Sequence, residues 1–240
     1  YRGELAAAMA ADAARHGAAL TSEDLAAHEA DWVGTIAQPY RDVELHEIPP
    51  NGQGIAALQA LGILRHLGLS SYPLDSAHSL HLQIEAMKLA LADAYRFVAD
   101  VDHMDVTPGT LLDDSYLQKR AALVDLKRAG DPGHGEPARG GTVYLTAADA
   151  SGMMVSFIQS NFHGFGSGVV VPGTGISLQN RGAGFVLDPR HPNSVAGGKR
   201  PFHTLTPVLV TDDDGRLEMT IGTPGGHGQT PIVLQVLNNI

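Results

Sequence analysis

The stretch ARGGTVYLTAAD at residues 138–149 places Thr142 directly after two glycines, at the start of an alternating strand pattern. A threonine at a chain N-terminus can be its own catalytic pair, because its α-amine, with a reference pKa of about 8, can accept the proton of its hydroxyl. An internal threonine gains that amine only by attacking the carbonyl of Gly141, forming an ester and letting water release the upstream segment. Gly140 and Gly141 suit this step, since glycine tolerates crowded backbone dihedrals. The alternative is a flexible linker that enters a sheet.

The strand that pairs with Thr142 follows from the spacing of the next turn. Residues 142–148 and 153–160 flank the turn sequence DASG, which is typical of an antiparallel hairpin. With the turn centred on that tetrapeptide, paired residue numbers sum to about 301 or 302, so Thr142 faces Gln159 or Ser160. A serine hydroxyl beside the threonine hydroxyl fits an activated nucleophile, although such a pair is also ordinary cross-strand pairing.

A second candidate is the segment GTPGGHG at residues 222–228, directly after a strand. The phosphate-loop pattern GxxxxGK[ST] is absent and no lysine follows, which disfavours phosphate binding. Gly225 and Gly226 can instead direct two backbone N–H groups at an oxygen that becomes anionic when a carbonyl is attacked. The remaining alternative is a tight turn between a strand and a helix.

A third candidate is the polar run KRPFHTLTP at residues 199–207. Its donor-rich pair His203 and Thr204 follows two basic residues, a combination that suits a ligand bearing a carboxylate or an amide. A solvated strand end has the same composition.

Twelve histidines raise the hypothesis of a metal site. His78 and His81 are three residues apart near a predicted helix start, but HExxH and comparable ligand spacings are absent. The sequence DDDG at residues 212–215 resembles part of a calcium loop without its later glutamate, so a hairpin turn is the better interpretation. We therefore expect neither a metal nor another cofactor.

The elements that must position these candidates change from helical to strand periodicity at Thr142. Helices first and strands second indicate an α+β layered fold of one structural domain, with a linker at residues 126–141 between its halves. A glycine-rich, uneven segment at residues 164–185 is more typical of a site-forming loop than of a strand. We expect helices at residues 1–19, 55–69 and 76–98, a short helix that begins after a cap at Thr21, and a last helix from Val233. The helix at 76–98 begins with a cap at Ser76. We expect strands at residues 40–48, 142–148, 153–160, 202–211 and 216–221.

Composition excludes several classes of protein. The 240 residues are 43% apolar, enough for a sizeable core, and the formal charge is −10. Only 16 lysines and arginines are present, without runs, which argues against a nucleic-acid partner and favours a small-molecule substrate. The absence of cysteine excludes thiol nucleophiles and disulfides, and no apolar run is long enough for a membrane span. Because the chain opens at Tyr1 within a helical pattern, we expect a piece of a longer protein.

Taken together, these motifs resemble the γ-glutamyltranspeptidases, which are N-terminal-nucleophile hydrolases of four-layered αββα fold made as a self-cleaving precursor. The resemblance runs through essentially all 240 residues. It includes YRGELAAAMAADAARHGAALTSEDLAAHEA, PPNGQGI, EAMKLALADAYRFVADVD and GTPGGHGQTPIVLQVLNNI. It implies that residues 1–141 are the C-terminal part of the large subunit and residues 142–240 the N-terminal part of the small subunit.

The resemblance also assigns roles to individual residues. Thr142 falls at the nucleophile and new N-terminus, so Gly141–Thr142 is the bond expected to be cut. Ser160 stands where the family has a second threonine that hydrogen-bonds the nucleophile, and Gly225 and Gly226 match the oxyanion-hole glycines. The remaining matches concern substrate binding: His203 and Thr204 occupy the positions of two serines that hold the α-carboxylate, and Asn180 and Arg181 lie on the neighbouring binding loop.

Two departures from the family pattern affect specificity. Gly184 replaces the acidic residue that holds the α-amine of a γ-glutamyl group, and Phe162 replaces an asparagine of the same region. Losing such a charge-assisted contact typically costs about 1.5 to 3 kcal/mol, so an acyl group without an amine fits better. The motif SFIQSNFHGFGSGVVVPGTGISLQNRG resembles the amidohydrolase and acylase branch, which includes oxamate amidohydrolase, and His163 and Arg181 could help to bind a short acid.

The sequence therefore predicts a self-cleaving amide hydrolase or acyltransferase with a threonine nucleophile, acting on a small carboxylate-bearing amide. One alternative is a true γ-glutamyltransferase that hydrolyses glutathione. An alternative of another class is a non-catalytic scaffold of the same fold, which the joint presence of Gly141, Thr142, Ser160 and the Gly225–Gly226 pair disfavours.

Overall fold

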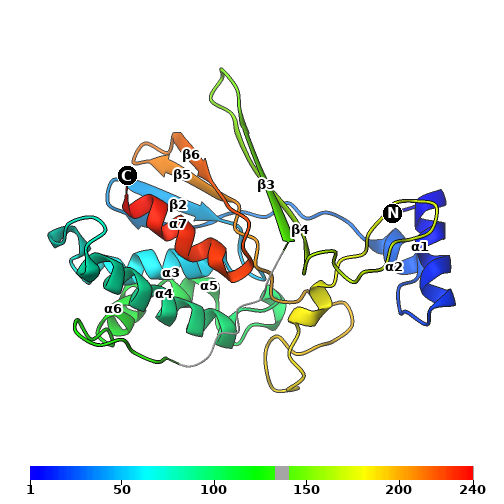
Figure 1. Cartoon of the computed structure of the whole chain (residues 1–240), viewed down its shortest axis with the longest axis horizontal. Helices are drawn as coiled ribbons and strands as arrows, with labels where there is room; N and C mark the ends of the chain where they lie inside the picture. The colour runs from blue at the N-terminus through cyan, green and yellow to red at the C-terminus, as the bar shows by residue number, and fades with distance from the viewer. Residues whose placement is uncertain (133–140, 240) are drawn as a thin grey trace.

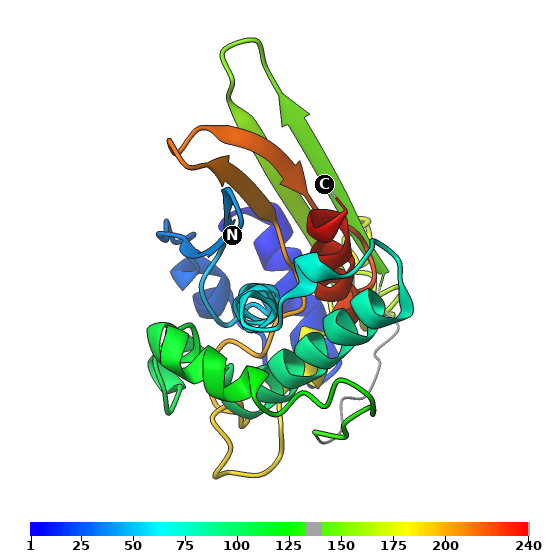
Figure 2. The same cartoon turned by 90° about the vertical axis from the view of Figure 1, so that its left-hand side faces the viewer.

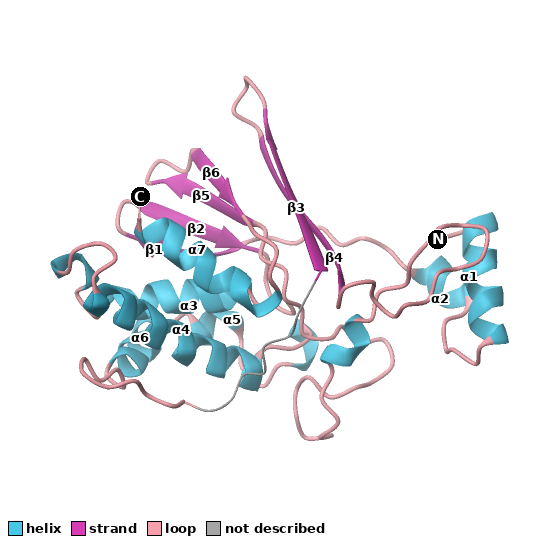
Figure 3. Cartoon of the chain, viewed as in Figure 1, coloured by secondary structure: helices cyan, strands magenta, loops and turns pink. Residues whose placement is uncertain are grey.

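The computed structural model describes residues 1–132 and 141–239 (Figures 1 and 3). Residues 133–140 of the expected linker at 126–141 lie outside these residues, and they include Arg139 and Gly140. The helices are α1 (Glu4–Arg15), α2 (Ser22–Ala27), α3 (Gly54–Arg65), α4 (Ala77–Phe97), α5 (Pro108–Leu111), α6 (Asp114–Ala121) and α7 (Gln229–Asn238). The strands are β1 (Ile36–Tyr40), β2 (Val43–Glu47), β3 (Gly141–Ala148), β4 (Met154–Phe162), β5 (Val208–Asp212) and β6 (Leu217–Ile221).

Side-chain caps fix where several helices begin. Thr21 and Asp24 form the predicted capping box before α2, and the Ser76 hydroxyl accepts a hydrogen bond from the Ser79 N–H at the start of α4. Both predicted caps are confirmed. The sequence patterns did not predict α5 and α6, which are short and begin after caps at Thr107 and Asp113.

A four-stranded antiparallel sheet has the order β1-β2-β5-β6 and so combines strands from both halves of the sequence. The strand predicted at residues 40–48 is confirmed as the shorter β2, whereas β1 was not predicted. Tyr40 ends β1 and pairs with Val43, the first residue of β2, across a turn in which Arg41 has a φ of 56°. The predicted strand included Arg41 and Asp42 because this turn lacks the glycine or asparagine that usually marks a two-residue hairpin.

The other predicted hairpins are confirmed, with one shorter strand. Strand β5 begins at Val208, whereas the sequence predicted a start at residue 202. Pro201 and Pro207 have no N–H to donate to a sheet, and the intervening His203 exchanges backbone hydrogen bonds with residues 51–53. Residues 202–207 therefore form an extended crossing segment beside the sheet.

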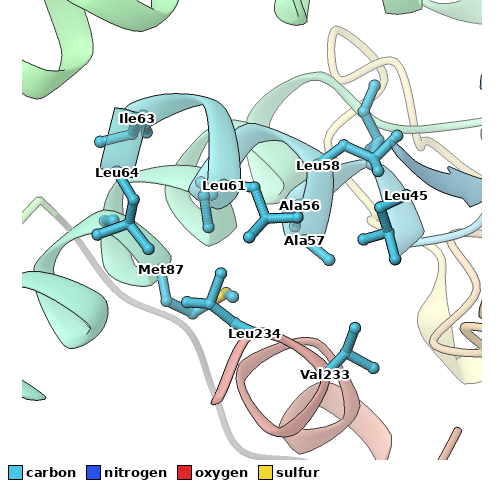
Figure 4. Packing of buried hydrophobic residues seen from close by; sticks show 14 of the residues in the cluster. Leu45, Ala56, Ala57, Leu58, Leu61, Ile63, Leu64, Met87, Val233 and Leu234 are labelled. Atoms are coloured by element: carbon cyan, nitrogen blue, oxygen red, sulfur yellow. The ribbon is translucent and has the colours of Figure 1, made fainter. Parts of the chain in front are cut away.

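The main core lies between the four-stranded sheet and the helices. Helix α3 is buried along Gly54–Leu64, and its leucines pack with Leu45 of β2, Met87 of α4 and Leu234 of α7 (Figure 4). Removal of these side chains from water supplies about 25 cal/mol per Å² of apolar surface. Helices α1 and α2 stand apart from this core, at the far end of an extended segment (Figure 1).

The β3–β4 hairpin approaches the sheet from the face opposite the helices (Figure 2). Along β6, Met219 and Ile221 face the helical core, while Thr220 is hydrogen-bonded to Thr146 of β3. Successive strand residues point to opposite faces, so the helices and the hairpin lie on different sides of β6. The fold is thus a mixed helix and sheet arrangement, and the start of β3 lies near the segment that follows β6.

Candidate active site

Thr142 and Ser160 are directly paired across the β3–β4 hairpin, and Ser160 is one of the two partners that the turn spacing predicted. The Thr142 hydroxyl donates to Ser160 Oγ at 3.3 Å, and Ser160 Oγ also accepts from the Phe162 N–H at 2.9 Å. The register shifts between Gly141 and Thr142, so Asn161 is an extra residue in β4. Such bulges bend a strand and redirect side chains, and this one lies where the sequence predicts the cleaved bond.

The Gly225–Gly226 turn follows β6 in backbone conformations that suit glycine. Gly225 has a φ of 140° and Gly226 a φ of 57°, both in the range that side-chain-bearing residues rarely adopt. Neither amide N–H has an acceptor among the described residues. The turn therefore offers two adjacent donors, which is what an oxyanion site requires.

Arg181 lies between the hairpin and the 199–207 segment. Its guanidinium covers the Phe162 ring at 4.3 Å, and its Nη1 donates to the Thr204 hydroxyl at 2.9 Å. Only 4% of Arg181 is exposed, and its Nε and Nη2 atoms have no hydrogen-bond partner among the described residues. Burial lowers the pKa of Arg181 to about 10, so the side chain stays charged at neutral pH. A buried cation without a counter-ion is a strong anion-binding feature.

Two histidines near this charge are held neutral. Burial, and then the charge of Arg181, lower the pKa of His203 to about 4, and the same two causes lower the pKa of His227. His203 Nδ1 accepts from the Leu205 N–H at 3.3 Å, and His227 Nδ1 is hydrogen-bonded to the Tyr95 hydroxyl at 3.0 Å. Arg181 therefore supplies the positive charge here, and the imidazoles remain uncharged at neutral pH.

His163 and Asn180 are hydrogen-bonded to each other. The His163 N–H donates to Asn180 Oδ1 at 3.1 Å, and Asn180 Nδ2 donates to His163 Nδ1 at 2.8 Å. The His163 ring also stacks on Phe162 at 4.1 Å. This pair ties the glycine-rich loop to the end of β4, and it places the Arg181 backbone next to the hairpin.

The two departures from the family pattern have structural correlates. A β-carbon at Gly184 would lie 3.2 Å from the Phe202 carbonyl oxygen, and the Gly184 carbonyl accepts from Asn193 Nδ2 at 2.7 Å. A side chain at position 184 would therefore require the neighbouring backbone at Phe202 to shift. Phe162 has a φ of 75°, and its ring takes part in the contact with Arg181.

Sequence reasoning missed Gln53, which precedes α3. Its amide nitrogen donates to the Thr204 and Gly226 carbonyl oxygens, at 2.8 Å each. The sequence signal that could have identified Gln53 is its position between two glycines, directly before an apolar helix. His203 also lines a cavity of about 320 Å³ with Asn51, Gly52 and Leu205, between β4 and the 202–207 segment.

Within the described residues, no group of three or more His, Asp or Glu side chains is placed to hold a metal ion. The same part of the chain has no helix long and apolar enough to cross a membrane.

Comparison with known proteins agrees with this arrangement. The gamma-glutamyltranspeptidase family model matches residues 1–240. The chain is 42% identical to the oxamate amidohydrolase proenzyme of Klebsiella pneumoniae, over 95% of this chain and 43% of that protein. It is 34% identical to the glutathione hydrolase-like YwrD proenzyme of Bacillus subtilis, over 99% of this chain and 46% of that protein.

Among solved structures, a cephalosporin acylase from Bacillus halodurans superposes with a TM-score of 0.88 at 43% identity, covering 100% of this chain and 43% of the acylase chain. The chain thus spans less than half the length of the relatives it matches. It belongs to the gamma-glutamyltranspeptidase family.

Proposed function

We propose that this chain contains the catalytic centre of a self-processing amide hydrolase whose nucleophile is Thr142. The observation that carries the proposal is the Thr142–Ser160 hydroxyl pair at a bulge next to Gly141. Membership of a family whose relatives are named as amidohydrolase and hydrolase proenzymes supports it. In maturation, Thr142 Oγ attacks the Gly141 carbonyl carbon, the C–N bond breaks, and water hydrolyses the resulting ester. The products are a Gly141 carboxylate and a free Thr142 α-amine.

During turnover the same oxygen attacks the substrate amide. The α-amine of Thr142 takes the hydroxyl proton and passes it to the leaving amine as the C–N bond breaks. Gly225 and Gly226 N–H groups stabilise the tetrahedral oxyanion, and Ser160 orients the nucleophile. Water then hydrolyses the acyl ester and restores the threonine. An amine in place of water gives acyl transfer.

We further propose that the acyl group carries a carboxylate and no ammonium. Arg181 supplies the buried positive charge, with two N–H-bearing nitrogens still unpartnered among the described residues. The residues around that charge are Thr204, His203, Asn180 and His163. Because Gly184 has no carboxylate for an α-ammonium, oxamate-like and glutaryl-like amides fit better than γ-glutamyl compounds.

The subunit division and the layering are part of the same proposal. Cleavage before Thr142 leaves residues 1–141 in a large subunit and 142–240 in a small one. The outward face of the hairpin, with exposed Val143, Leu145 and Phe157, is the face that a second helical layer covers in a four-layer αββα arrangement.

A substrate panel with four proteins expressed from the full-length gene tests the function. Native enzyme should hydrolyse glutaryl anilide and oxamate faster than γ-glutamyl anilide, and Thr142→Ala should be inactive on all of them. Arg181→Gln should raise KM for glutaryl anilide about 10- to 100-fold, which is the loss of affinity expected when a charge-assisted contact is removed. It should leave KM for the uncharged butyryl anilide unchanged. The matched control is Arg190→Gln, an exposed arginine bonded to Asp188, which should behave as native.

Two outcomes would overturn parts of the proposal. Strong γ-glutamyl turnover by the native enzyme would make it a glutathione-type hydrolase. Folded native protein without turnover of any amide, and with a single uncut chain, would favour the non-catalytic scaffold.

A further inference from the structure

Gln53 joins two parts of the proposed site through a single side chain. It is fully buried, and its Nε2 donates to the Thr204 carbonyl and to the Gly226 carbonyl, each at 2.8 Å. Thr204 belongs to the segment that contacts Arg181, and Gly226 belongs to the oxyanion turn. One amide group thus spans the substrate-binding segment and the turn expected to stabilise the transition state.

The backbone of Gln53 is itself fixed to the same segment. The Gln53 N–H donates to the His203 carbonyl at 2.7 Å, and the His203 N–H donates to the Asn51 carbonyl at 2.8 Å. Asn51 Nδ2 also donates to the Pro201 carbonyl at 2.7 Å. The chain before α3 therefore lies as a short parallel bridge against residues 201–204, and the Gln53 side chain starts from a defined place.

The chemistry at this position requires an amide. A primary amide nitrogen has two hydrogens, and both are used here on two carbonyl oxygens. A carboxylate of the same shape would face those two oxygens with negative charge and no donor. A thioether would keep the volume but leave both carbonyls without this donor, which is unfavourable for buried acceptors.

We propose that Gln53 is a positioning residue that holds the Gly225–Gly226 turn in register with the carboxylate-binding segment. The inference rests on the proposed function. Gln53 precedes the Gly141–Thr142 bond, so in the mature enzyme a large-subunit side chain fixes two small-subunit segments. Fixing the Gly226 carbonyl limits rotation of the turn formed by the two glycines, and so restricts the directions of their N–H donors.

The test uses Gln53→Glu and Gln53→Met in enzyme matured from the full-length gene. Displacing an oxyanion donor typically reduces kcat by about 100-fold or more, so we expect a loss of about that size for both glutaryl and butyryl anilide. Protonation of the carboxyl introduced by Gln53→Glu restores one donor. The ratio of the Gln53→Glu kcat to the native kcat should therefore rise as the pH falls, whereas the Gln53→Met ratio should stay constant.

Gln59→Glu is the matched structural control. Gln59 is also fully buried, and its amide contacts Asp93, away from the proposed site. This variant should lose thermal stability but keep kcat within about threefold of native, since the proposed reacting groups are untouched. A Gln53 variant with the native melting temperature that stays uncut counts for the proposal, because self-cleavage also passes through a tetrahedral oxyanion, formed on the Gly141 carbonyl.

Native kcat in Gln53→Met, or equal kcat losses in the Gln53 and Gln59 variants, would overturn the positioning role. Thr142→Ala, measured in parallel, separates this result from a failure of the proposed function. If Thr142→Ala is inactive and the Gln53 variants are native, only the present inference is lost. If Thr142→Ala retains full activity, the proposed function itself is wrong.

Discussion

Arg181 is buried and charged, and the partly buried His203 near it is neutral. Nε and Nη2 of the guanidinium have no hydrogen-bond partner among the described residues, so burial of Arg181 costs free energy that a bound anion would offset. His203 stays unprotonated, first because burial lowers its pKa and second because another cation beside Arg181 is unfavourable. The pH dependence of folding should report this arrangement.

Below neutral pH, His203 should reduce the stability of the folded protein. Its pKa is about 4 when folded, against an ordinary value of 6.5, so between these values the unfolded chain binds a proton that the folded chain excludes. The free energy of unfolding therefore falls as the pH drops from about 6.5 to about 4. We expect His203→Asn, which retains an acceptor for the Leu205 N–H, to weaken this dependence in thermal melts between pH 7 and pH 4.5.

The control for this measurement is His103→Asn, because His103 is an exposed histidine in a surface turn. Its melting profile should follow that of the native protein. If His203→Asn shows the full native loss of stability toward acid, the buried neutral state of His203 is wrong.

The β3–β4 hairpin and β6 together determine where Thr142 lies. Tyr144 is two residues after Thr142 on the same face of β3, and its hydroxyl is hydrogen-bonded to Ser156 Oγ at 3.0 Å. Its ring lies directly against Gly222, at the point where β6 leads into the oxyanion turn. The absence of a side chain at Gly222 thus sets the separation between nucleophile and turn.

Gly222→Ala should disturb catalysis through the hairpin. A β-carbon at position 222 would overlap the Tyr144 ring, so either the ring or the hairpin must shift. A shift of about 1 Å in a reacting group can cost about 100-fold in rate, and we expect kcat to fall by about 10- to 100-fold. Steady-state kinetics with glutaryl anilide measures kcat, and the melting temperature is measured on the same variant.

The double variant Gly222→Ala/Tyr144→Ala is the control, since it removes the ring that causes the overlap. Its kcat loss should be smaller than the product of the two single losses. Independent, multiplicative losses would show that the Gly222–Tyr144 contact does not position Thr142.

The hairpin could be predicted from the sequence because its contacts are local. A four-residue turn between alternating strands fixes the register, and that register places Ser160 opposite Thr142. The β1–β2 turn could not be predicted in the same way, because Arg41 and Asp42 are not among the glycine and asparagine residues that usually mark a two-residue hairpin turn. Local rules thus limit the partner of Thr142 to Gln159 or Ser160, but they miss a turn without glycine or asparagine.

At the scale of the whole molecule, the candidate site depends on contacts between distant parts of the sequence. The four-stranded sheet joins β1 and β2 with β5 and β6, and Gln53 bonds to Thr204 and Gly226 across the same divide. Periodicity within a segment carries no information about such partners. Short motifs and the family resemblance identified the glycine turn and the 203–204 pair, whereas the role of Gln53 follows only from its contacts in the folded chain.

The same arrangement explains how a cut before Thr142 can leave a stable protein. Helices α3 and α4 share one core with β5 and α7, which lie on the other side of the proposed cleavage point. The two products would therefore remain associated through buried surface after the Gly141–Thr142 bond is broken.

The central claim is that Thr142 becomes an N-terminal residue. The most direct measurement is the intact mass and N-terminal sequence of the chains purified from the full-length gene, beside Thr142→Ala and Thr142→Ser. The account predicts two native chains, the smaller of which begins at Thr142, and a single uncut chain for Thr142→Ala. Thr142→Ser should still be cleaved, at a lower rate than the native chain, because a serine hydroxyl can attack the same carbonyl. An uncut native chain, a small subunit beginning at another residue, or normal cleavage of Thr142→Ala would contradict it.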